Sequence, residues 1–483
     1  MRLMQLFVRK YLLILLLAIS AQGCVITAQV DDSSPDVGND YGLGDTGISD
    51  AALHWSDYFA DTSLVNLIEE ALANNLDARM ALQRIAIAQS QSRIARSALF
   101  PQLSMGGSAG VRRYGDYTMD GVGNDDTNRS EPVLEEGKRL PKPYTDYKIA
   151  PNFAWEADIW GKLRHKKKAA LSRWLASKEG MHWMQTEIVS QVATLYFQLM
   201  GLDNERTVIL QNIELQELGM ELIKIQKIGG KVNQLAVDQF EAQFLNTQSR
   251  LPEIEQAIIA NESAINLLLG RYPQKVERNS TTLAQHLPDS VHLGLPGDLL
   301  AFRPDIKKAE LELEAAKADV HAAKAAFYPT LTLNGELGFQ AFGPDKLFVP
   351  GSGIYALGAG LSAPLFQMGK IKAQFAQTKG MQHNAVLNYQ KTILQAFNEV
   401  YVSYNAFENI RKRVAIKSEE VEVQKRAFTN SSDLFSVGYA SYLEVIMAQR
   451  RMVEAQLELT QLRADQLKAK VDVYKALGGG WAE

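Results

Sequence analysis

The sequence has little cysteine and no excess of basic residues. It contains one cysteine in 483 residues, so an internal disulfide is excluded. Its 51 basic and 55 acidic residues give a formal net charge of −4. That balance provides no polycationic surface, and nucleic acid is not an expected partner. The seven histidines show no paired metal-ligand spacing, so the sequence predicts neither a metal site nor a cofactor.

Motifs for enzyme chemistry are also scarce. Residues 358–363 fit a loose dinucleotide-binding glycine pattern, but Pro364 and the alternating pattern around it exclude the helix start that would hold a phosphate. Met181, His182 and Met184 are residue types that bind copper. Neighbouring positions point to different faces of a helix, however, which favours a packing role. We expect no enzymatic activity.

The main feature of the chain is a long internal repeat. Residues 161–270 align with residues 369–478 without a gap, at a constant shift of 369 − 161 = 208. Matched pairs include Gly161 with Gly369, Val192 with Val400, Tyr196 with Tyr404, Gly230 with Gly438, Leu235 with Leu443 and Gly270 with Gly478. Loops tolerate insertions and packed helices do not, so the repeat predicts two continuous helical hairpins, 161–270 and 369–478.

Each hairpin is preceded by a shorter helix and two strands. We predict one helix over 61–99, N-capped by Asp61, and its counterpart over 304–327. The predicted strands are about 102–114, 144–156, 330–342 and 353–363. The first structural repeat is thus 61–290 and the second 291–483. The first repeat carries extra polar residues between the strands, and 115–143 should form an exposed outer loop.

The strands alternate between apolar and polar residues. Leu331, Leu333 and Leu337 lie between polar residues such as Thr332 and Glu336. A tilted strand of about ten residues can cross a bilayer, but closed barrels need about eight strands or more. Because an open sheet edge in lipid leaves amides unpaired, membrane insertion requires several chains to share one barrel. Two hairpins of a soluble β-domain are the alternative.

The helices that follow the strands are unusually long. Each stays in helical pattern for about fifty residues or more, which corresponds to roughly 75 to 100 Å. Leu215, Leu218, Leu222 and Ile225 follow heptad-like spacing, and so does the segment 453–474. This spacing is typical of a coiled-coil seam.

The N-terminus has the features of an export signal. Arg2, Arg9 and Lys10 precede a short apolar core, which predicts a signal peptide over 1–23. Cys24 follows in a segment, 20–24, that resembles a bacterial lipobox, so we expect it to be acylated. Ordinary signal cleavage nearby is the alternative. Residues 24–60 are rich in Asp, Gly, Ser and Pro at their start and are predicted to form a lipid-anchored tether.

Together these features resemble the TolC family of outer-membrane efflux ducts, in its lipoprotein branch. The resemblance rests on residues 294–306, on the helix ends at Phe100-Pro101 and Tyr328-Pro329, and on residues 437–445. It implies a mainly α fold with a membrane β part, in which duplicated helical hairpins form an α-barrel tunnel. Four strands per chain would complete a trimeric twelve-stranded barrel in the outer membrane.

The resemblance also implies partners and sites. The expected partners of the homotrimer are outer-membrane lipid, a periplasmic adaptor and an inner-membrane pump of the RND class, with passive export of drugs, metals or other small solutes. The matching gate residues are Leu443, Glu444 and Met447. Adaptor contacts would involve Gly230, Val232, Gly438, Tyr439 and Ser441 at the two hairpin turns. Two alternatives stay open: a duct for type I protein secretion, and a periplasmic coiled coil without a pore.

Overall fold

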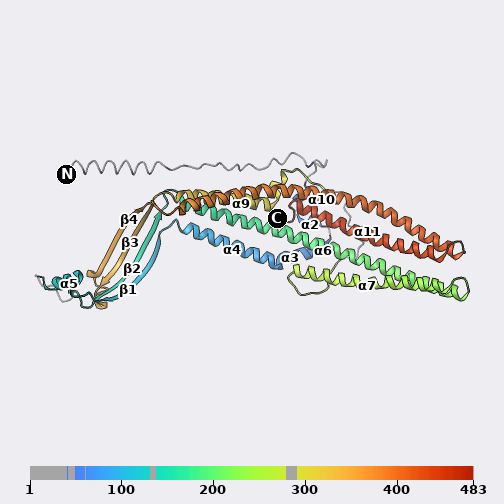
Figure 1. Ribbon diagram of the computed structural model, residues 1–483, viewed down its shortest axis with the longest axis horizontal. Coiled ribbons are helices and arrows are strands. Elements are labelled where there is room, and N and C mark those ends of the chain that lie inside the picture. The colour runs from blue at the N-terminus through green and yellow to red at the C-terminus, as the bar shows by residue number, and fades with distance from the viewer. Residues whose placement is uncertain (1–40, 42–48, 60, 131–137, 279–290, 482–483) are drawn as a thin grey trace. The chain divides into compact units, whose positions relative to one another are not determined.

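A computed structural model describes residues 41, 49–59, 61–130, 138–278 and 291–481 of the chain. The predicted signal peptide, Cys24 and most of the predicted tether lie outside these residues. All described residues belong to one compact unit, which spans 35–483. Within it the fold is mostly helical with four antiparallel strands, which confirms the predicted fold class (Figure 1).

The long helices form two hairpins of equal dimensions. The first consists of α6 (Lys162–Ile228) and α7 (Gln234–Leu268), and the second of α10 (Lys370–Ser436) and α11 (Tyr442–Ala476). α6 and α10 each have 67 residues, which corresponds to about 100 Å, and α7 and α11 each have 35. Among the described residues, every helix is either too short or too polar to cross a bilayer.

The remaining helices are shorter. They are the 3-10 helix η1 (Asp50–Ala52), α2 (Trp55–Tyr58), α3 (Thr62–Asn74), α4 (Leu76–Ser97), α5 (Met119–Arg129), α8 (Asp298–Phe302) and α9 (Pro304–Ala325), with 3-10 turns at Pro344–Lys346 and Pro350–Ser352. Our prediction of one helix over 61–99 was wrong, because the chain forms α3 and α4 there. Asn75 ends α3 with an extended ψ of 129° and caps α4, its side chain accepting from the N–H groups of Asp77 and Ala78.

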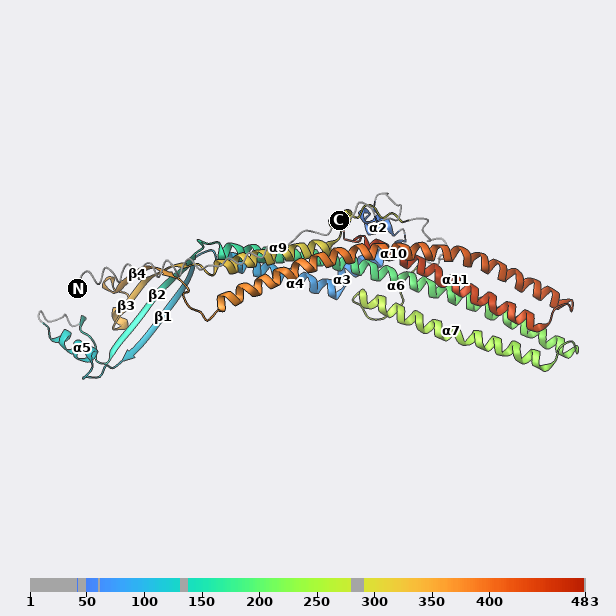
Figure 2. The same cartoon turned by 45° about the horizontal axis from the view of Figure 1, so that its top comes forward.

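The strands form one sheet in the order β1-β2-β3-β4 (Figure 2). Their bounds are Gln102–Arg112, Tyr144–Ala157, Thr330–Ala341 and Gly353–Ser362. The register pairs Leu103 with Phe153, Trp155 with Leu333 and Leu331 with Leu361, so most of the large apolar residues of the four strands share one face. On the other face Lys148 forms an ion pair with Glu336 at 2.7 Å.

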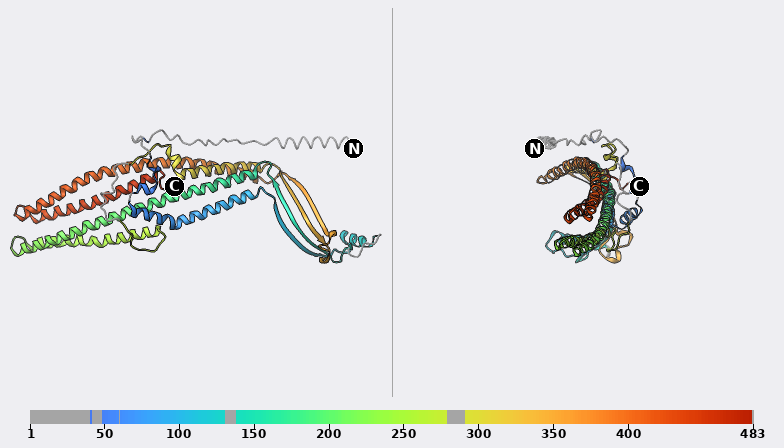
Figure 3. Two further views of the ribbon diagram at one scale, coloured as in Figure 1. Left: turned by 180° about the vertical axis from the view of Figure 1, so that it is seen from behind. Right: turned by 90° about the vertical axis from the view of Figure 1, so that its right-hand side faces the viewer.

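The helices lie side by side in two series that share α6 and α10. Near the strands the order of neighbours is α4, α6, α9 and α10, and beyond them it is α7, α6, α11 and α10 (Figure 3). The largest apolar core surrounds α3 and the middle of α6, with Tyr196, Leu199 and Met200 fully buried. α10 is in the chain's second core, and its substantial helix contacts in the described chain are with α8, α9 and α11 of the second repeat.

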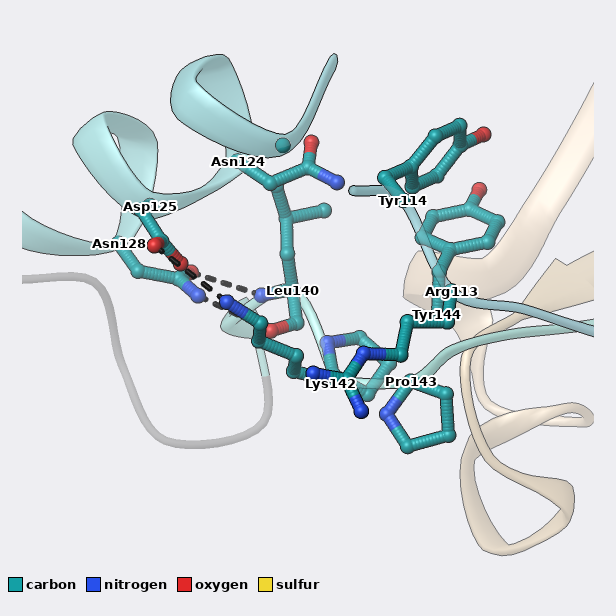
Figure 4. A pocket seen from close by; sticks show the side chains of 11 residues that line it. Arg113, Tyr114, Asn124, Asp125, Asn128, Leu140, Lys142, Pro143 and Tyr144 are labelled. Carbon is teal, nitrogen blue, oxygen red and sulfur yellow. Dashed lines mark hydrogen bonds and ion pairs between the residues drawn. The ribbon is translucent and has the colours of Figure 1, made fainter. Parts of the chain in front are cut away.

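The predicted outer loop over 115–143 is mostly exposed in its described residues, but it is not purely a loop. It contains the helix α5, which is capped by Thr118. Asn128 of α5 bonds both the N–H and the carbonyl of Leu140, and Lys142 forms an ion pair with Asp125 (Figure 4). Lys142 also forms an ion pair with Asp116. These bonds fold a glycine-containing, weakly helical segment back onto the ends of the strands.

Candidate gate at the hairpin turns

The two hairpin turns have the same backbone geometry. Gly230 and Gly438 both have a positive φ, of 75° and 84°. After each glycine the next N–H donates to the carbonyl five residues earlier: Lys231 to Gln226 at 2.9 Å, and Tyr439 to Leu434 at 2.8 Å. This is the bond of a helix that ends in a left-handed residue, a conformation that glycine adopts without strain. The repeat therefore preserves the shape of both turns.

A shared apolar cluster holds the two turns together. It is built from Ile223, Ala236, Val237, Phe240 and Val445, with Val232, Phe428, Phe435, Tyr442 and Ile446 packed against it. Its members come from all four long helices, α6, α7, α10 and α11. Val232, one of the predicted adaptor contacts, therefore contributes to the core of the tip, whereas Tyr439 at the second turn is exposed.

Leu443 and Met447 lie on the opposite side of α11 from this cluster. They are one helical turn apart, and 48% and 40% of their respective surfaces are exposed, although both are large and apolar. Glu444, Arg450 and Arg451 are exposed beside them. The two arginines were not among the predicted gate residues, although their spacing from Met447 on a helix places them next to that face.

Glu444 has a local role that the gate prediction did not include. Its carboxylate accepts the backbone N–H of Ser441 at 2.6 Å and the Ser441 hydroxyl at 3.0 Å, forming a capping box at the start of α11. The pKa of Glu444 is below its ordinary value, chiefly because of the backbone hydrogen bond and then because of the hydroxyl. The sequence signal was present, since Ser441 and Glu444 have the Ser-x-x-Glu spacing of this motif.

The residues considered for copper binding, 181–184, pack against aromatic and basic side chains. His182 stacks on Trp481 with ring centroids 4.8 Å apart, and Trp183 lies under the guanidinium of Arg303. These contacts fit the packing role favoured for this motif over copper binding. Within the described ranges, no three His, Cys, Asp or Glu side chains are grouped so that they could hold a metal ion. A small pocket lies between α5 and the strand ends, lined by Tyr114, Asp125 and Lys142 among others (Figure 4).

Comparison with known proteins decides the family. The family profile described as "Outer membrane efflux protein" matches residues 67–271 and 295–479, which is most of the chain. The chain belongs to the outer membrane efflux protein family. The solvent efflux pump outer membrane protein SrpC of Pseudomonas putida is 31% identical over 448 residues, covering 91% of this chain and 90% of SrpC.

Two further relatives extend this assignment. The cation efflux system protein CusC of Escherichia coli is 27% identical over 476 residues, covering 96% of this chain and 98% of CusC. The open-state crystal structure of the MtrE outer membrane channel of Neisseria gonorrhoeae has the same fold. Its TM-score is 0.81 at 24% identity, and the match covers 93% of this chain and 97% of that one. The prediction of an outer-membrane efflux channel that is not an enzyme is confirmed, which disfavours the coiled coil without a pore.

Proposed function

We propose that three copies of this outer membrane efflux protein form one exit duct, with a shared twelve-stranded barrel in the outer membrane and a helical tunnel below it. The proposal rests chiefly on one observation about the tandem repeat. β2 and α6 of the first repeat contact the second repeat, whereas the equivalent elements β4 and α10 have no such neighbour among the substantial contacts of the described chain. The main contacts between the first repeat and the second have repeat-related equivalents that are not among the substantial contacts of the described chain.

The sheet supplies the first such contact. β2 pairs with β3 inside the chain, whereas β1 and β4 are the two edges of the sheet. The equivalent of β2 pairing with β3 is β4 pairing with β1 of the next copy. The shift is 208 for β2 and the hairpins, and 305 − 77 = 228 for the segment from α4 to β1, as between Asp77 and Asp305. With these shifts, the pair Ile149–Phe339 corresponds to Leu357 and Val111. A closed ring of copies would leave no edge in the membrane.

The helices supply the second contact. α6 packs against α9 and α11 of the other repeat. The repeat-related contacts are α10 with α4 and α10 with α7, and neither is among the substantial contacts of the described chain. α10 also has few buried residues for its 67-residue length. A neighbouring copy that offers α4 and α7 to α10 would complete both series of helices.

A cross-linking experiment tests this arrangement. In a Leu357→Cys/Val111→Cys variant, oxidation or a short bifunctional thiol reagent should link copies into covalent dimers and trimers, because paired strands bring Cα atoms to about 5 Å. Leu357→Cys/Met105→Cys is the matched control. Both β1 positions are exposed on the same face, but they are six residues apart, about 20 Å. Equal cross-linking of both variants, or none of either, would contradict the shared barrel.

The proposal includes an anchor and partners. Acylated Cys24 would hold the mature chain in the outer membrane. A periplasmic adaptor would contact the tip at Gly230, Val232, Gly438, Tyr439 and Ser441 and link it to an inner-membrane pump of the RND class. The names of the relatives refer to solvents in one case and cations in another, which supports passive export of small solutes over type I protein secretion.

Leu443, Met447 and Glu444 are proposed to narrow the tunnel at the tip. Three copies would place two exposed apolar rings and a ring of carboxylates around one axis, where apolar rings resist wetting and like charges repel. In planar bilayers, Leu443→Ala/Met447→Ala should raise the single-channel conductance. Leu235→Ala is the matched control, because Leu235 is the repeat-related position in the first hairpin and is similarly exposed. Unchanged conductance in the double variant would remove these residues from the gate.

A further inference from the structure

The four junctions between strands and helices lie at the same end of the strands, on the helix-bearing side of the sheet. β1 and β3 begin there and β2 and β4 end there, as the register shows by pairing Gln102 with Ala154 and Thr330 with Ser362. α4, α6, α9 and α10 therefore all start or finish at this end (Figure 1). Charges near these helix ends occupy a single level of the molecule.

That level carries a concentration of positive charge. Ten lysines and arginines lie within two turns of the helix ends, and three of them, Lys162, Arg164 and Lys168, are paired with acids. The other seven are Arg93 and Arg96 of α4, Lys166 and Lys167 of α6, Lys324 of α9, and Lys370 and Lys372 of α10. None of the seven has an ion-pair partner among the residues that the structure describes, and all except the half-buried Lys167 are exposed. We call this set the junction cations.

Acidic residues do not neutralise the junction cations. Those at the same level are Glu156, Asp158 and Asp319, and each is already paired with another base. Their partners are Lys162, Arg164 and Arg173 respectively. The excess is local, since the whole chain has a net charge of −4. A surplus of unpaired bases at one height produces a positive potential that attracts anions.

Aromatic side chains lie at the same junctions. Trp160 stacks on Tyr328 with ring centroids 4.8 Å apart and donates to the carbonyl of Pro329, and both rings are partly exposed. Phe100 and Phe366 are exposed at two other junctions. Partly exposed Trp and Tyr are typical of the boundary between hydrocarbon and lipid headgroups. The junction cations follow this boundary on the side away from the apolar sheet.

We propose that the junction cations bind the phosphate groups of anionic phospholipids in the leaflet next to the helices. This inference rests on the proposed function, because it requires the sheet to be inserted with its helix-bearing end at the periplasmic side. A lipid headgroup is the fitting anion, since cations a few ångströms beyond an aromatic boundary reach the depth of the phosphates. The bound lipids would fix the height of the duct in the membrane.

The test compares lipid binding by charge variants of the full-length trimer. Phosphatidylglycerol and phosphatidylcholine are offered in equal amounts, and bound lipid is counted by native mass spectrometry. The wild type should favour phosphatidylglycerol. Lys166→Gln/Lys167→Gln/Lys370→Gln/Lys372→Gln should reduce that preference by at least about tenfold, because each base near a membrane surface adds to the electrostatic attraction for anionic lipid. The four Lys→Arg changes, which keep the charge, should retain the preference.

A matched control separates position from net charge. Lys224→Gln/Lys231→Gln/Lys391→Gln/Lys412→Gln removes the same charge from exposed lysines elsewhere on the long helices and their turns. It should keep the preference for phosphatidylglycerol. An equal loss in both quadruple variants, an undiminished preference in the junction variant, or displacement of the lipid by free inorganic phosphate would overturn the inference.

Channel recordings distinguish this failure from failure of the proposed function. A wild-type trimer that conducts in bilayers but shows no lipid preference would sink the lipid inference alone. A wild-type protein that neither assembles nor conducts would sink the proposed duct, and the lipid inference with it.

Discussion

Asn75 in the first repeat and Arg303 in the second occupy equivalent positions, 228 residues apart. Both side chains donate a hydrogen bond to the last carbonyl of a long helix, but the donor groups differ. The side-chain amide of Asn75 donates to the carbonyl of Leu268 at 2.9 Å, at the end of α7. Arg303 donates to the carbonyl of Ala476 at 2.9 Å, at the end of α11, and Ala476 is Leu268 shifted by 208. Duplication has kept the bonded carbonyl while the donor has changed.

The difference lies in what else each donor holds. Asn75 is neutral and caps α4 within the apolar core of the first repeat. Arg303 is 1% exposed and also binds Asp305 and Glu399, with 2.6 and 2.7 Å contacts, so it ties α9 and α10 to the end of α11. In the second repeat, α8 lies at the position of the end of α3, and α9, α10 and α11 are joined through a buried cation.

Of the changes that test this comparison, removing each donor should have the largest effect on the free energy of unfolding. Arg303→Ala removes a buried side chain and leaves the half-buried carboxylate of Asp305 and the carbonyl of Ala476 without their donor, so it should lower the stability of the assembled protein by about 3 kcal/mol. Asn75→Ala removes a helix cap and one tertiary bond and should cost about 1 to 2 kcal/mol. Denaturant unfolding followed by circular dichroism measures both.

Arg303→Lys is the control for the first variant. It keeps the charge but loses the planar fork that reaches two acids and a carbonyl, so its stability should fall between those of Arg303→Ala and the wild type. If Asn75→Ala destabilises the protein as much as Arg303→Ala, the two joints are energetically alike and the buried cation has no special role.

Tyr196 and Tyr404 give a second, smaller comparison on α6 and α10. The Tyr196 hydroxyl donates to Asp61 at 2.7 Å, and both side chains are buried. Tyr196→Phe leaves a buried carboxylate oxygen without this donor and should cost about 1 to 3 kcal/mol. Tyr404 is only half-buried, so Tyr404→Phe should cost less than about 1 kcal/mol. Equal losses in thermal or denaturant unfolding would show that burial does not distinguish the two repeats.

Sequence reasoning located the hairpins because their signals are local. A glycine with a positive φ lies directly before α6 and α10, and another lies two residues after the end of each of the four long helices. Such glycines and an ungapped repeat can both be recognised in a single sequence. The alternation of the strands is equally local. These features place the two hairpins and the sheet.

The features that sequence reasoning missed depend on distant partners or competing signals. The apolar pattern runs on through Asn75, so the break there follows from its cap and its bond to Leu268, 193 residues away. α5 is a poor helix by composition, and its bonds to Leu140 and Lys142 order it. Glu444 was assigned to the gate, and its Ser-x-x-Glu spacing was overlooked.

The caps of the two hairpin turns give the smallest and sharpest comparison. Asn233 caps α7 with one bond, its side chain accepting from Ala236 at 3.2 Å, whereas Ser441 and Glu444 share the cap of α11. In Ser441→Ala the carboxylate of Glu444 can still accept the backbone N–H at position 441, but Asn233→Ala removes the only side-chain cap of its turn. Asn233→Ala should therefore lower the free energy of local opening at its turn by about 1 kcal/mol relative to the wild type. Ser441→Ala should lower the opening free energy at the second turn by less.

Hydrogen exchange of the amides in the first turns of α7 and α11 measures this difference directly. Glu444→Gln is the informative companion, because glutamine can keep the capping contact while removing the charge. If Glu444→Gln leaves exchange at the second turn unchanged but alters the ion selectivity of the channel, the carboxylate acts on the pore and the cap needs only an acceptor. Faster exchange after Ser441→Ala than after Asn233→Ala would contradict the sharing of the cap, because the carboxylate alone would then be unable to hold the turn.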